Sequence, residues 1–222
     1  MSPFRSAAAL AVGVSLVVAG QAGAAAKKPK IEPACHLVAD PAGDTSVYPA
    51  VGLTEDALDI TSVDVASDKN AITGVIRVKK LAKSSSNAPM GMNWSVTFDG
   101  GGTVFTLAGH STATGAVVFD TSYASTAGGS IYGPGTTGVF DTAKNEVRIT
   151  APLSLMSKQA DIVAGKTKIT SIGGTTGPEV LVPDPTGVFG STIFSDSPST
   201  ADSTTGGKDY LAGSPSCVVV GK

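Results

Sequence analysis

Acidic side chains that could bind a cation are concentrated near the start of the chain. Asp40 and Asp44 flank a Pro-Ala-Gly turn sequence that can bring both carboxylates to one point. Four further acids follow closely, namely Glu55, Asp56, Asp59 and Asp64. Because calcium is bound by carboxylate and carbonyl oxygens of such loops, this pattern is compatible with a calcium site. The alternative is that Asp beside Pro and Gly caps turns, since no EF-hand spacing is present.

A second candidate for chemistry is Gly109-His110-Ser111-Thr112-Ala113, which is similar to the G-x-S-x-G elbow of serine hydrolases, with Ala113 at the last glycine position. That elbow requires a strand, a sharp turn and a helix, whereas residues 117–123 after it are predicted to form a strand. The chain has one other histidine, His36. We therefore interpret His110 as a loop residue and the protein as non-enzymatic. A hydrolase that uses Ser111, His110 and an acid is the alternative.

Aromatic side chains, which stack on sugars in carbohydrate-binding modules, are scarce at 5% of the chain with a single Trp. Trp94 alternates in phase with Val96 and Phe98, so we expect it in the core. Tyr48 and Tyr132 are the remaining candidates for a ligand-binding surface.

The N-terminus has the pattern of an export signal over residues 1–26, in which Arg5 precedes an apolar core and a small-residue cleavage region. Residues 27–34 are predicted to be a flexible leader, and residues 35–222 a single secreted domain. Removing the signal takes away Arg5 and no acid, which changes the formal net charge from −2 to −3. This balance argues against a nucleic-acid partner, and no later apolar run is long enough to span a membrane.

The two cysteines, Cys35 and Cys217, lie near the two ends of the predicted domain. In an exported chain without a CxxC motif, two cysteines favour a disulfide over a metal or redox site. We therefore expect a bond between Cys35 and Cys217 that closes nearly the whole domain. If the ends meet, three late acids can approach the early ones, namely Asp196, Asp202 and Asp209.

Alternation of apolar and polar residues predicts a chain built of short strands. The clearest apolar rows are Trp94, Val96 and Phe98, and later Val147, Ile149, Ala151 and Leu153. Glycine-rich residues 99–103 are predicted to connect the first row to a strand at residues 104–108. Further strands are expected at residues 58–65, 72–79, 117–123, 168–172 and 217–220, with a helical turn within residues 154–164. With 27 glycines, the pattern predicts an all-β, two-sheet antiparallel β-sandwich that is jelly-roll-like, with an immunoglobulin-like topology as the alternative.

Several of these segments together resemble secreted actinobacterial β-sandwich domains of the family 9 carbohydrate-binding and DOMON-like group. The segments are residues 40–44, 58–60, 75–78, 145–149 and 213–217. The resemblance implies a sandwich that holds a structural calcium ion, with Asp40, Asp44 and Asp59 as the ligands. Haem-binding members of the group use a Met and a His, and Met92 and His110 match them in residue type.

These observations predict a secreted, non-catalytic binding or structural module that is stabilised by calcium. Its expected partner is an extracellular ligand such as a glycan or cell-wall component. A carbohydrate-binding module is the first alternative, and it requires Tyr48 or Tyr132 on an exposed face. The serine hydrolase is the second.

Overall fold

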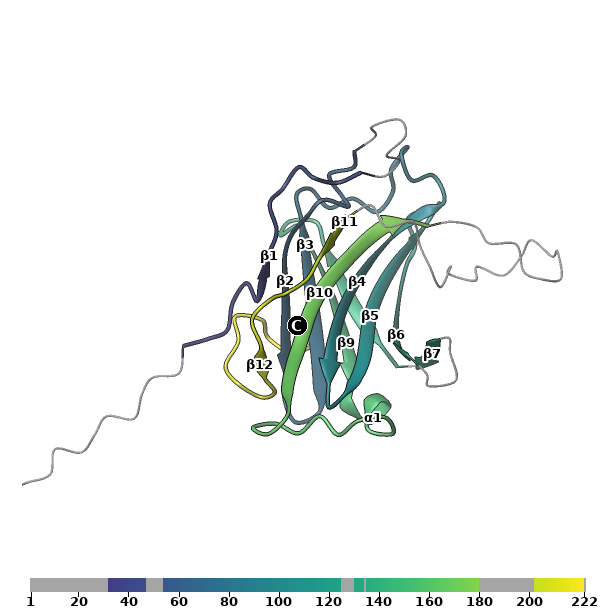
Figure 1. Cartoon of the computed structure of the whole chain (residues 1–222). Helices are drawn as coiled ribbons and strands as arrows, with labels where there is room; N and C mark the ends of the chain where they lie inside the picture. Colours follow the sequence, from purple (N-terminus) through teal and green to yellow (C-terminus); the bar gives the residue numbers. More distant parts are fainter. Residues whose placement is uncertain (1–31, 47–53, 125–129, 134, 180–201, 222) are drawn as a thin grey trace, which may run out of the picture. The chain divides into compact units, whose positions relative to one another are not determined.

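Two antiparallel β-sheets form the part of the chain that the computed structural model describes, which is residues 32–46, 54–124, 130–133, 135–179 and 202–221 (Figure 1). The five-stranded sheet has the order β1 (Val38–Ala39), β2 (Ile60–Ser67), β3 (Ala71–Val78), β9 (Glu146–Pro152) and β8 (Thr137–Asp141). The seven-stranded sheet has the order β11 (Asp202–Thr204), β10 (Lys168–Pro178), β4 (Gly91–Gly100), β5 (Thr103–Thr112), β6 (Val117–Ala124) and β7 (Ser130–Gly133), with β12 (Tyr210–Leu211) also paired to β10. The predicted two-sheet sandwich is confirmed.

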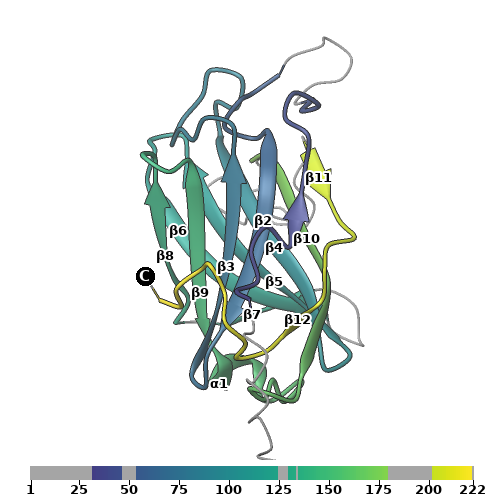
Figure 2. The ribbon, with the colours of Figure 1, turned by 90° about the vertical axis from the view of Figure 1, so that its left-hand side faces the viewer.

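The core lies between the two sheets, as Figure 2 shows with β2, β3 and β9 in front of β4 and β5. The predicted row of Trp94, Val96 and Phe98 on β4 is fully buried, at 0% exposure. The row of Val147, Ile149 and Ala151 on β9 is equally buried. Trp94 also donates its indole N–H to the carbonyl of Ala57 at 2.7 Å, which satisfies the one polar atom of the ring.

Glycines on the inner faces allow the two sheets to approach closely. A Cβ atom at Gly138 of β8 would lie 2.4 Å from the ring of Phe119 on β6. A Cβ atom at Gly174 of β10 would lie 2.6 Å from the side chain of Val63 on β2. Large apolar side chains of one sheet therefore fill the space above glycines of the other, which reduces the need for bulky aromatic residues in the core.

Two segments differ from the prediction. Residues 109–112, expected in a loop, continue β5 because they pair with β4 through to Gly91 opposite Thr112. Residues 217–220, expected as a strand, form no strand, and Val218 instead packs on Ala66 and Val75 at the outer face of the five-stranded sheet. The helical turn is found as α1 (Leu153–Met156). No helix in the described residues is long and apolar enough to cross a membrane.

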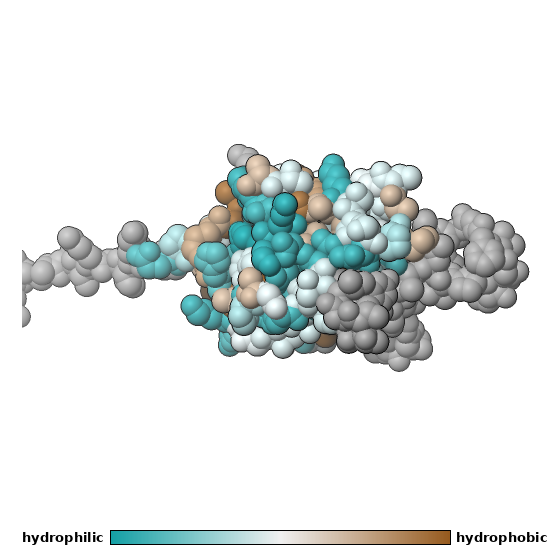
Figure 3. Space-filling view, turned by 90° about the horizontal axis from the view of Figure 1, so that it is seen from above, coloured by the Kyte–Doolittle hydropathy of each residue, from teal (hydrophilic) through white to brown (hydrophobic). Residues whose placement is uncertain are grey.

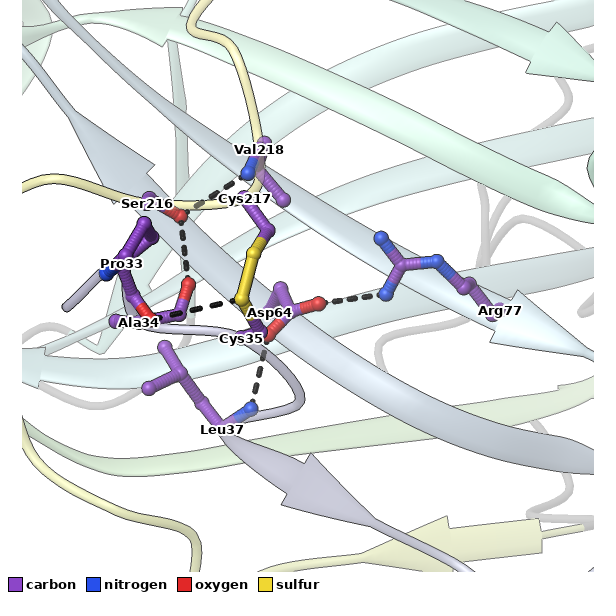
Figure 4. The surroundings of a disulfide bond; sticks show 9 residues. All are labelled: Pro33, Ala34, Cys35, Leu37, Asp64, Arg77, Ser216, Cys217 and Val218. Atoms are coloured by element: carbon purple, nitrogen blue, oxygen red, sulfur yellow. Dashed lines mark hydrogen bonds and ion pairs between the residues drawn. A yellow bond between two sulfur atoms is a disulfide. The ribbon is translucent and has the colours of Figure 1, made fainter.

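Both ends of the domain are fastened beside the five-stranded sheet (Figure 4). Cys35 and Cys217 form the expected disulfide, with their Cα atoms 5.3 Å apart. The two segments also exchange backbone hydrogen bonds, from the N–H of Cys217 to the carbonyl of Ala34 at 3.0 Å and from the N–H of Ala34 to Pro215 at 2.9 Å. The termini are thus paired both covalently and by hydrogen bonds.

A ladder of ion pairs crosses the outer face of the five-stranded sheet next to the disulfide. Asp64, which is 1% exposed, accepts hydrogen bonds from Arg77 at 2.6 Å and from the backbone N–H of Leu37 at 2.8 Å. Arg77 also contacts Glu146 at 3.3 Å, and Glu146 contacts Arg148 at 2.6 Å. Asp64 therefore anchors the N-terminal segment and takes no part in the acidic cluster described below.

Candidate cation site

Three aspartates converge where the end of β1 lies near the start of β11. Asp40 directly follows β1, Asp44 lies in the loop after it, and Asp202 is the first residue of β11. One oxygen of each carboxylate lies within 4.8 Å of the other two. Because β1 belongs to the five-stranded sheet and β11 to the seven-stranded sheet, the cluster bridges the two layers.

Asp202 is the most deeply placed member of the cluster, with 8% of its surface exposed. Its register opposite Thr176 of β10 directs it to β2, where it accepts the N–H of Ile60 at 2.7 Å. Burial raises the pKa of Asp202 to about 6, and the charges of Asp40 and Asp44 add to this effect. The hydrogen bond from Ile60 acts in the opposite sense but is outweighed.

Asp40 has an oxygen that lacks a partner. Its Oδ2 atom is buried and forms no hydrogen bond, and the same is true of Oγ1 of Thr45 nearby in sequence. Burial raises the pKa of Asp40, and the charges of Asp44 and Asp59 raise it further, although a hydrogen bond from Thr204 lowers it. An unpaired buried acceptor is costly in free energy, so this oxygen is available for a ligand.

Asp59, predicted as a calcium ligand, lies beside the cluster in a second role. Both of its carboxylate oxygens accept the N–H of Gly43 at 2.9 Å, which holds the turn between Asp40 and Asp44. Lys79 approaches Asp59 at 3.8 Å and Asp56 at 2.7 Å. Asp59 therefore shapes the loop that carries the first two aspartates of the cluster.

The geometry of the cluster suits calcium. A calcium ion binds oxygens at about 2.3–2.6 Å, so oxygens up to about 5 Å apart can share one ion. Asp44 is exposed and gives access from solvent, whereas Asp202 is buried. Figure 3 shows the molecule from above, and hydrophilic residues extend across the middle of the face that it shows.

The hydrolase alternative required Ser111 and His110 to act together, but these neighbouring residues of β5 direct their side chains to opposite faces of the sheet. Ser111 is fully buried, and its hydroxyl accepts the N–H of Met92 at 3.0 Å. His110 is the preceding residue of the same strand, so its ring lies on the other face of the sheet. Met92 is opposite Ser111 in register and is also fully buried, so it shares no sheet face with His110 either.

His110 instead lies between two carboxylates that the sequence did not reveal. Its Nε2 atom is 3.0 Å from Asp120 of β6, and its Nδ1 atom is 2.6 Å from Glu179, which directly follows β10. Glu179 is separated from His110 by 69 positions, and no local motif links them. The group became visible only through the pairing of the strands.

The remaining predicted site residues fall outside what the structure describes. Tyr48 and Asp196 lie outside the described residues. Tyr132 is in β7, but its side chain is outside the described part of the chain. Asp209 is described, and it pairs with exposed Lys168 away from the three clustered aspartates.

Comparisons with protein-family models, with curated protein sequences and with solved structures found no match to this chain.

Proposed function

We propose that the protein is an extracellular, non-catalytic binding or structural module whose sandwich is stabilised by a calcium ion held by Asp40, Asp44 and Asp202. The observation that carries the proposal is the convergence of three carboxylates from both sheets within 4.8 Å. An ion at this point joins the end of β1 to the start of β11, so it acts as a cross-link between the layers.

The electrostatics of the cluster support a cation as its natural partner. Burial and the neighbouring carboxylates raise the pKa values of Asp40 and Asp202, which means that the charged forms repel one another in the folded protein. A divalent ion removes this repulsion and supplies a partner for the unpaired Oδ2 atom of Asp40. Carboxylate oxygens without nitrogen or sulfur ligands favour a hard cation such as calcium.

The extracellular assignment is supported by the signal-like residues 1–26 and by the disulfide between Cys35 and Cys217, since disulfides persist in oxidising compartments. The resemblance noted in the sequence makes a glycan or cell-wall component the expected partner. Binding of the protein to insoluble cell-wall polysaccharide tests that partner class directly.

Calcium should raise the melting temperature of the oxidised protein relative to the same sample in chelator. At about 100-fold excess over the dissociation constant, a single ion contributes about 2.7 kcal/mol, which corresponds to roughly 5–10 °C for a domain of this size. Differential scanning calorimetry with and without chelator, together with metal analysis of the purified protein, measures this effect.

The variants D40N and D202N should lose the calcium-dependent shift. D209N is the matched control, because Asp209 is also an aspartate in the C-terminal part but pairs with Lys168. The proposal fails if chelator leaves the midpoint of the wild-type protein unchanged and no metal copurifies. A shift that D40N and D202N both retain would place the ion elsewhere.

A further inference from the structure

His110 lies on the outer face of the seven-stranded sheet, in the middle of four neighbouring strands. It is opposite Asn93 of β4 on one side and Val118 of β6 on the other. Its ring is largely enclosed, with 8% of the residue exposed. The inward row of β5, which includes Phe105 and Leu107, is on the opposite face and belongs to the core.

The two ring nitrogens of His110 connect elements that do not pair with each other. Nε2 contacts Asp120 on β6 at 3.0 Å, and Nδ1 contacts Glu179 at the end of β10 at 2.6 Å. In the sheet, β4 and β5 separate β10 from β6. The side chain of His110 therefore links β6 to the end of β10. At that end, the backbone N–H of Glu179 also donates to the carbonyl of Gly91 at 2.8 Å.

When Asp120 and Glu179 are both ionised, only the protonated ring can satisfy both contacts. An imidazolium has two N–H donors, whereas a neutral imidazole has one donor and one lone pair. Two acceptor carboxylates at hydrogen-bond distance from both nitrogens thus require the charged form. Loss of the proton would turn a lone pair toward one carboxylate, and that contact would change from attractive to repulsive.

We propose that His110 is a proton-operated clamp, which when charged fastens the end of β10 to β6, and which on losing its proton releases one carboxylate and loosens residues 177–179. The titratable groups that the described part of the chain brings to the ring are Asp120 from β6 and Glu179 after β10. On β4 the residue opposite His110 in register is the neutral Asn93, whose Oδ1 atom is buried without a hydrogen bond. None of the three residues of this clamp belongs to the cluster of Asp40, Asp44 and Asp202.

The surroundings keep the clamp closed at neutral pH. Burial by itself lowers the pKa of His110, but hydrogen bonds and charges from Asp120 and Glu179 outweigh it and raise the pKa to about 9. The clamp is therefore expected to open in alkaline solution.

The protonation state of the ring can be observed directly. In an H36Q background, which leaves His110 as the single histidine, the ¹⁵N shifts of the ring should report an imidazolium up to about pH 8 and a transition near pH 9. D120N and E179Q should each lower the midpoint by about one unit or more, because each removes one opposite charge. D209N should leave it unchanged. A wild-type midpoint near pH 6.5, or one insensitive to both substitutions, would overturn the proposal.

The opening of β10 has an independent readout in amide exchange. At pH 7, H110Q should exchange the Glu179 amide at least about 10-fold faster than wild type, while the amide of Ile149 in the other sheet is unaffected. After correction for intrinsic rates, wild type should approach the H110Q value above about pH 9. D120N, which leaves the histidine in place, should show an intermediate rate. Equal protection of Glu179 in wild type and both variants at pH 7 would show that the ring is not a clamp.

Discussion

At Asp202, burial and the charges of Asp40 and Asp44 raise the pKa from 3.8 to about 6. The folded protein thus holds this proton more tightly than the unfolded chain does. Between about pH 4 and pH 6 the free energy of unfolding should fall as the pH rises, because the ionised carboxylate is disfavoured only in the folded state. In the metal-free protein, the ionisation of this single carboxyl group therefore lowers the free energy of unfolding at neutral pH.

The variant D202N tests this dependence. Asparagine retains an oxygen for the N–H of Ile60 but cannot ionise. Metal-free wild type should therefore lose about 1 kcal/mol of stability between pH 5 and pH 7 through this residue, and metal-free D202N should not show that loss. Urea unfolding in chelator at the two pH values measures it. Parallel pH profiles for wild type and D202N would contradict the assignment, and added calcium should restore wild type but not D202N at pH 7.

The candidate site was partly accessible from the sequence. The turn around Asp40 and Asp44 is a local signal, and the cysteine pair indicated that late acids such as Asp202 could reach it. Asp120 and Glu179 gave no such signal, because each becomes a neighbour of His110 only through strand pairing. Contacts between distant strands carry no periodicity that a local pattern can reveal.

At the scale of single elements, the inner face of β8 depends on Gly138. A methyl group there would lie 2.4 Å from Phe119 and 2.5 Å from the carbonyl of Arg148, so β8 or β6 would have to move. G138A should therefore destabilise the protein by about 1–3 kcal/mol. V139A is the matched control on the same strand, since Val139 is 49% exposed, and it should change stability by less than about 0.5 kcal/mol. Chemical denaturation of both variants measures the difference in the free energy of unfolding. Equal midpoints for G138A and V139A would show that β8 can shift without loss of stability.

The strands with clean alternation were predictable, because β4 and β9 each place one apolar row in the core. The full length of β5 was not, since residues 109–112 contain Gly, His and Ser and have no strong strand preference. They are extended because β4 offers a complete ladder of partners on one side. Residues 217–220 show the reverse case. Their valines favour a strand, but Val218 packs on Ala66 and Val75 and the segment pairs with no strand.

For the whole molecule, the disulfide limits the freedom of the unfolded chain. Cys35 and Cys217 are 182 positions apart, so in the loop-entropy description the bond stabilises the fold by about 5 kcal/mol. The double variant C35S/C217S should show this loss in urea unfolding with calcium held constant. A loss below about 1 kcal/mol would mean that, without the disulfide, the hydrogen bonds between Ala34 and residues 215–217 already keep the two ends of the domain together in the unfolded ensemble.

The same bond has a mechanical consequence. Tension applied to the chain on both sides of the disulfide passes from Cys35 to Cys217 through the sulfur atoms, and the sheets between them carry no load. A single-molecule pulling experiment should find no unfolding step while the bond is intact. After reduction, a segment of 182 positions becomes extensible and can lengthen by about 600 Å. The oxidised domain can therefore stay folded within a chain under tension, with its acidic cluster and its outer sheet face intact.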